Sequence, residues 1–149
     1  PEIVRRALAD GVDAAIVVPN CPVCHQTSTL TARALEEAGI ATVLMGCAKD
    51  IVEHAAAARF LFSDFPLGNS AGRPHDVASQ DQTLELALRL LEFAPGPQTT
   101  MQSPLRWNAD GRWKLDYLNL EQIGEAELKR RRAEFDRQKE LARPNRVAG

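Results

Sequence analysis

Short apolar runs alternate with amphipathic segments along the chain up to residue 97. Continuous apolar runs rich in β-branched residues occupy 14–18 and 40–45, which is typical of strands covered on both faces. A third strand is predicted at 59–65. Strands that alternate with helices predict βαβ units, a parallel sheet and right-handed crossovers. The helices are expected at 2–10, 28–38, 48–58 and 79–93.

The helix predicted at 79–93 has the clearest pattern. One face carries Leu84, Ala87, Leu88 and Leu91, at the spacing of an amphipathic helix. Either Ser79 or Asp81 is expected to cap its amino terminus.

The pattern changes at the Pro- and Gly-rich segment 94–97, which predicts a boundary between domains 1–97 and 98–149. The first part carries 7 basic and 12 acidic side chains (net -5), and the second carries 11 basic and 8 acidic side chains (net +3). In the second part, strands at 105–107 and 112–118 would flank a turn at 108–111 and form a β-hairpin. A charged helix is predicted at 126–142, packed on the first domain or extending from it.

Together these elements predict an α/β fold, with a partial Rossmann- or flavodoxin-like parallel sheet and flanking helices, followed by a C-terminal β-hairpin and helix. Three strands make a small sheet, and the chain begins with Pro1 rather than Met. We therefore interpret it as a fragment of a longer protein whose amino-terminal strands are missing.

The composition favours a globular protein over a nucleic-acid-binding, membrane or disulfide-rich one. The 149 residues have a net charge of -2 and are 44% hydrophobic, which suits an ordinary globular domain without a broad field for nucleic acid or a membrane surface. No apolar run approaches the roughly 18–20 residues of a membrane helix. The basic run 129–132 is interpreted as a solvated helix face, with a nucleic-acid patch as the alternative. Three cysteines are too few for a disulfide scaffold, so we expect a cytoplasmic protein.

The candidate chemistry lies in Cys21-Pro22-Val23-Cys24-His25, directly after a predicted strand. Parallel α/β sheets collect ligands and catalytic groups at the carboxyl ends of their strands. Unpaired N–H groups at the start of the following helix favour a thiolate. We assign Cys21 as the attacking thiol and Cys24 as the resolving thiol. His25 is a third candidate, to stabilise the thiolate or donate a proton.

Other interpretations of the motif stay open. Cys-x-x-Cys-His is also the attachment signature of c-type haem, which requires export. Structural zinc would need further ligands, for which Cys47, His54 and His75 are the other soft candidates. Both cysteines could instead be small core residues, and Cys47 is expected to be a small residue at a tight turn. A thioredoxin-like protein is a further alternative, although the cis-proline strand that faces the pair in that fold has no obvious counterpart and two strands already follow in βαβ order.

The third strand leads into a long loop over 63–74, which should face the same side as the cysteines. Asp64, Gly68 and Asn69 are predicted to contact a polar substrate, and Arg73 to bind a carboxylate. Each of these residues could equally serve the turn itself.

Three segments, at 17–27, 34–40 and 65–68, resemble the component B family of glycine, sarcosine, betaine and D-proline reductases (selenoprotein B), and more closely its short cysteine-containing relatives. The resemblance covers roughly 11–93 and extends more loosely to 107–117. Many members have selenocysteine where this chain has Cys21.

The resemblance implies a thiol or selenol that attacks a substrate carbon and releases a leaving group reductively. It also implies a small-molecule substrate, an electron-donating thiol protein, and a partner subunit whose pyruvoyl group holds the amine. No cofactor or metal is expected in this chain itself. Because sulfur replaces selenium, we predict a thiol-dependent oxidoreductase rather than an amine reductase. A non-catalytic metal- or ligand-binding module that uses the same thiols is the alternative.

Overall fold

The first unit of the protein is built around a parallel sheet of four strands in the order β1-β2-β3-β4. The computed structural model describes residues 1–116 and 124–142, and the chain divides into units Pro1–Ala109 and Asp110–Gly149. This sheet confirms the predicted α/β fold. Its strands are β1 (Ala14–Val17), β2 (Ala41–Gly46), β3 (Arg59–Phe62) and β4 (Thr99–Gln102).

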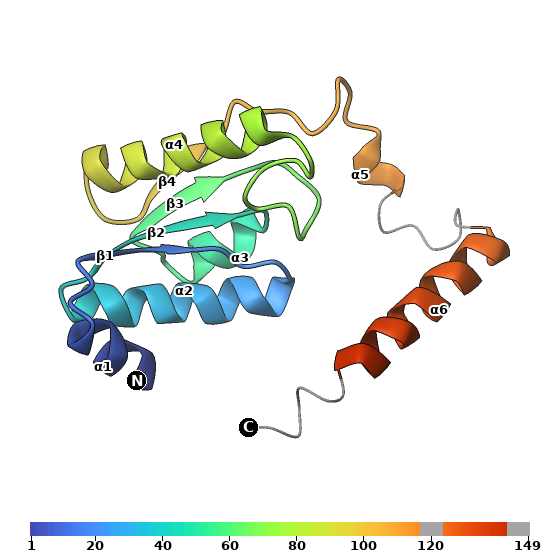
Figure 1. The fold of residues 1–149 in the computed structure, drawn as a ribbon. Helices are drawn as coiled ribbons and strands as arrows, with labels where there is room; N and C mark the ends of the chain where they lie inside the picture. Colours follow the sequence, from blue (N-terminus) through green and yellow to red (C-terminus); the bar gives the residue numbers. More distant parts are fainter. Residues whose placement is uncertain (117–123, 143–149) are drawn as a thin grey trace. The chain divides into compact units, whose positions relative to one another are not determined.

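Helices cover both faces of the sheet (Figure 1). On one face, Ala87 and Leu90 of α4 (Val77–Phe93) pack on Val43, Met45 and Leu61. On the other face, Leu44 and Phe60 form a second cluster with residues of and after α3. The helices of this second face are α1 (Glu2–Ala9), α2 (Pro22–Glu37) and α3 (Lys49–His54). Because all strands are parallel, the loops after each strand gather at one edge of the sheet.

Two helices begin earlier than predicted. The helix expected at 28–38 begins at Pro22, because Cys21 acts as its N-cap and proline is well suited to the first helical position. The cap of α4 is Asp76 rather than Ser79 or Asp81: its Oδ1 accepts the Ser79 N–H at 3.0 Å.

The strand β1 lies at the edge of the sheet, and alternate residues on one of its faces are exposed, so the prediction that both its faces are covered was wrong. It pairs with β2 from Ala14 to Val17. Ile16, which shares the face of Val43, is 38% exposed, because α4 packs over β2 and β3.

The secondary structure after residue 97 differs from the prediction. Strand β4 pairs with β3 from Thr99 to Gln102, and its largely polar sequence had given no strand signal. The predicted hairpin was wrong in the described residues, because 105–112 forms no strand and Trp113–Asp116 forms the helical turn α5. An isolated hairpin needs an apolar surface to pack on, whereas Leu115 is 71% exposed. Residues 117 and 118 lie outside the described part.

The charged helix predicted at 126–142 is confirmed as α6 (Glu125–Ala142), which belongs to the second unit. Arg130 and Arg131 both pair with Glu127, at 2.7 and 2.8 Å, and these bonds lower the pKa of Glu127 to about 2. Within residues 1–116 and 124–142, no helix is long and apolar enough to span a membrane.

Candidate functional site

The two cysteines of the motif lie where β1 ends and α2 begins. Cys21 has an extended backbone (φ -107°, ψ 166°), and its Sγ accepts the Cys24 N–H at 3.1 Å. The Cα atoms of the pair are 4.9 Å apart, and the two sulfur atoms lie at disulfide distance. Cys21 is exposed and Cys24 is half-buried. An incoming group therefore reaches the Cys21 sulfur more easily.

The third residue of the predicted catalytic set, His25, points into the interior. It is fully buried. Its Nδ1 lies 2.7 Å from the carbonyl oxygen of Cys21, and its Nε2 accepts the backbone N–H of Cys47 at 3.0 Å. Because a carbonyl oxygen can only accept and an amide N–H can only donate, the neutral ring with its proton on Nδ1 satisfies both contacts. The imidazole thus joins the loop after β1 to the loop after β2.

The absence of a side chain at Gly46 makes room for this imidazole. A Cβ at Gly46 would lie 2.9 Å from both Cδ2 and Nε2 of His25. The position of His25 therefore depends on a glycine at the end of the neighbouring strand.

A third loop joins the same network through Ser70. Its hydroxyl donates to the carbonyl oxygen of Pro19 at 2.7 Å and lies 3.7 Å from the Cys47 sulfur. Burial raises the pKa of the Cys47 thiol, and the negative charge of Asp64 raises it further against the lowering effect of Ser70 and nearby backbone hydrogen bonds. These effects favour the thiol form of Cys47.

The predicted substrate loop lines a cavity of about 510 Å³ between α4 and the end of β1. Gly68 and Asn69 both contribute to its wall, as does Asn20, the neighbour of Cys21. Ile16 and Leu84 supply apolar wall. This volume falls within the range of small-molecule sites. Two of the four predicted substrate residues therefore share a cavity with Asn20, the residue that precedes the cysteine motif.

The other two predicted substrate residues lie elsewhere. The guanidinium of Arg73 pairs with Asp76 at 2.7 Å and lines a separate cavity of about 400 Å³ with Trp107. Asp64 is half-buried, and its negative charge raises the pKa of the Cys47 thiol. Arg73 is thus tied to the cap of α4, which supports its structural interpretation in the loop.

The shape of this loop depends on Gly72, and we expect Gly72→Ala to destabilise it. Gly72 has φ +113°, and a Cβ there would lie 2.8 Å from the Cα of Gln80. The strain should lower the free energy of unfolding by about 2 kcal/mol. Urea denaturation followed by circular dichroism measures this change. Gly68→Ala is the matched control, since its φ is also positive (+94°) but no atom lies within 4 Å of the added Cβ; equal losses would contradict the steric argument.

The roles of Ser70, which joins the third loop to the other two, and of Gly46, which makes room for His25, were not predicted from the sequence. Neither belongs to a motif, and their partners come from distant parts of the chain. In the described part of the chain, no three His, Cys, Asp or Glu side chains lie close enough together to hold a metal ion.

Comparison with known proteins finds one relative, which is a reductase subunit. The chain is 28% identical over 109 residues to D-proline reductase subunit gamma from Acetoanaerobium sticklandii. It is a distant homologue of a reductase subunit. The match covers 73% of this chain but 45% of that subunit, so the chain spans less than half the length of its relative. No protein-family model and no solved structure matches the chain. This match supports a relation to a reductase subunit, but not to component B in particular.

Proposed function

We propose that this protein is a thiol-dependent oxidoreductase related to reductase component B, in which Cys21 attacks the substrate and Cys24 resolves the adduct. The observation that carries the proposal is the exposed Cys21 sulfur at the amino terminus of α2, at disulfide distance from Cys24. Homology to a D-proline reductase subunit supports a reductive reaction that involves partner subunits. The cavity lined by Asn20, Gly68 and Asn69 is the proposed place for the substrate.

The reaction is a two-electron reduction by the cysteine pair. The Cys21 thiolate displaces a leaving group from an activated substrate carbon and forms a carbon–sulfur bond. The Cys24 thiolate then attacks the Cys21 sulfur, so that a disulfide forms and the carbon leaves with the electron pair and takes a proton. The substrate carbon must therefore lie next to an electron-withdrawing group, such as a carbonyl. The α2 amino terminus and the Cys24 N–H stabilise negative charge on Cys21.

Alkylation of the reduced protein with iodoacetamide at neutral pH tests this proposal. We expect Cys21 to be labelled faster in the folded protein than in urea, by about tenfold, because the helix terminus stabilises its thiolate. Cys47 should be labelled more slowly in the folded protein, since burial raises the pKa of its thiol. Peptide mapping by mass spectrometry assigns the labelled sites.

Two results would contradict the proposed function. One is equal labelling of Cys21 in the folded and unfolded protein. The other is a Cys21–Cys24 disulfide that, once formed, dithiothreitol does not reduce in the folded protein. A stoichiometric metal ion held by both thiols after purification without chelator would instead favour a binding module.

A further inference from the structure

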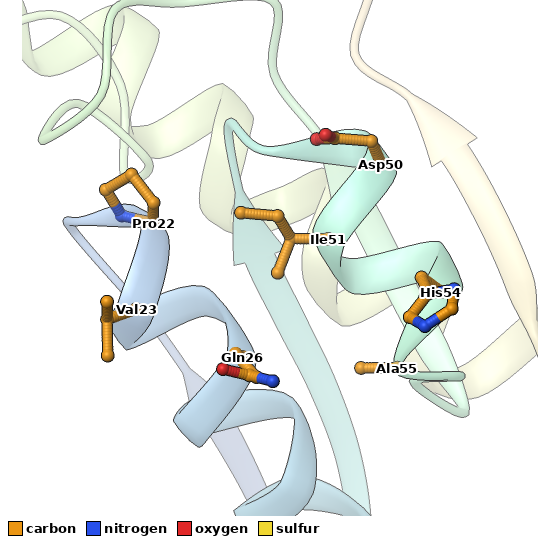
Figure 2. Close-up of a pocket in the computed structure, with 7 residues that line it drawn as sticks. All are labelled: Pro22, Val23, Gln26, Asp50, Ile51, His54 and Ala55. Carbon is orange, nitrogen blue, oxygen red and sulfur yellow. The ribbon is translucent and has the colours of Figure 1, made fainter.

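A third cavity flanks the cysteine motif on the opposite face of the sheet from the substrate loop. It has a volume of about 390 Å³ and lies between α2 and α3 (Figure 2). Pro22 and Val23 form one side, and these are the two residues between the cysteines. Part of the cavity wall therefore comes from the segment between Cys21 and Cys24. Its lining consists of Pro22, Val23, Gln26, Asp50, Ile51, His54 and Ala55.

The surface of this groove is apolar with an acidic end. Val23 is 70% exposed although it is a large apolar side chain, and Ile51 points from α3 toward α2 (Figure 2). The carboxylate of Asp50 lies at the rim and forms no ion pair within the described residues, since the adjacent Lys49 pairs with Glu53 at 3.9 Å. A ligand of this groove would thus offer an apolar group and a positive charge.

We propose that the groove binds a cysteine-bearing segment of the dithiol protein that reduces the Cys21–Cys24 disulfide. This inference rests on the proposed function and adds the docking surface and the chemistry of the partner. An apolar residue next to the partner's cysteine packs on Val23 and Ile51, and a basic residue pairs with Asp50. Substrate and reductant then approach the same sulfur from opposite faces of the sheet.

The exchange needs only the partner's two thiols. The first partner thiolate attacks the Sγ of Cys21, the more exposed sulfur, and Cys24 leaves as a thiolate that takes a proton. The second partner thiolate attacks its own neighbour in the mixed disulfide and releases Cys21. The partner is oxidised to a disulfide, and the pair is reduced by two electrons.

Two synthetic peptides, Arg-Cys-Leu and Glu-Cys-Leu, test the charge at the groove. Each peptide reduces the oxidised protein, and each rate is divided by the rate of the same peptide with a small aromatic disulfide, which corrects for the reactivity of its thiol. We expect the corrected rate to be about 3–10-fold higher for the Arg peptide at low ionic strength, with a smaller difference at high salt.

Substitutions locate this preference on the groove. Asp50→Lys should reverse the order of the two peptides, and Ile51→Asn should slow both. Glu37→Lys is the matched control, because it makes the same charge change at the far end of α2 and should leave the ratio unchanged. Equal corrected rates in the native protein, or an order that Asp50→Lys does not alter, would overturn the docking surface. Failure of both peptides and of dithiothreitol to reduce the pair would instead overturn the proposed function.

Discussion

His25→Ala should lower the free energy of unfolding by about 3–5 kcal/mol. The loss has two sources. Removing a fully buried ring leaves a cavity, and the carbonyl oxygen of Cys21 and the N–H of Cys47 both lose their partner. Urea denaturation followed by circular dichroism measures the change.

Two further variants separate the volume of the ring from its hydrogen bonds. His25→Phe keeps an aromatic ring but provides neither nitrogen, so it should remain destabilised by about 2–3 kcal/mol. His25→Asn places an N–H donor near the position of Nδ1 and should restore part of the contact with Cys21. The reduction potential of the Cys21–Cys24 pair should change in His25→Phe and return toward the native value in His25→Asn.

The control for a merely structural role is Thr83→Ala on α4. Thr83 is also fully buried, and its hydroxyl donates to the Ser79 carbonyl oxygen at 2.7 Å, within the helix. This variant should lose stability without any change in the reduction potential. If the potential moves as much in Thr83→Ala as in His25→Phe, His25 does not position the cysteine pair.

The parallel sheet could be predicted, although not the order of its strands, because the local sequence of the central strands β2 and β3 is typical of strands. The apolar β-branched run at 40–45 corresponds to β2, whose residues from Thr42 to Gly46 are all buried. Strand β4, by contrast, reads Thr-Thr-Met-Gln, and its pairing with β3 supplies the stability that its composition does not. Strands of this kind depend on tertiary contacts rather than on propensity.

The same distinction separates the predicted and missed parts of the site. The Cys21–Cys24 pair is local, because three positions span one turn of helix and bring the sulfur atoms together. The partner of His25 at Cys47 lies 22 residues away, and that of Ser70 at Pro19 lies 51 residues away. No periodicity or motif encodes such contacts, so the link that His25 makes between two loops was not predicted, and its catalytic role stays a prediction.

Cys21→Ser should abolish the rapid reaction of the pair with a disulfide, whereas Cys24→Ser should stop the reaction at the first mixed disulfide. The test uses reduced protein in a Cys47→Ser background and an aromatic disulfide that releases a coloured thiolate. With both cysteines present, Cys21 forms a mixed disulfide and Cys24 then closes the ring, so that two aryl thiolates are released. Cys24→Ser should release one at a comparable rate and keep the other bound. Cys21→Ser should react at least tenfold more slowly, because the remaining Cys24 is half-buried.

The two variants should differ in reactivity because the two cysteines have different surroundings. Cys21 is the exposed N-cap whose sulfur accepts the Cys24 N–H, whereas Cys24 lies within the first turn of α2. Intact mass spectrometry distinguishes a trapped adduct from a closed disulfide, and absorbance gives the two rates. Equal reactivity of the two single variants would show that neither sulfur is set apart by the helix terminus. A trapped adduct in Cys21→Ser rather than in Cys24→Ser would exchange the two roles, with Cys24 as the attacking thiol.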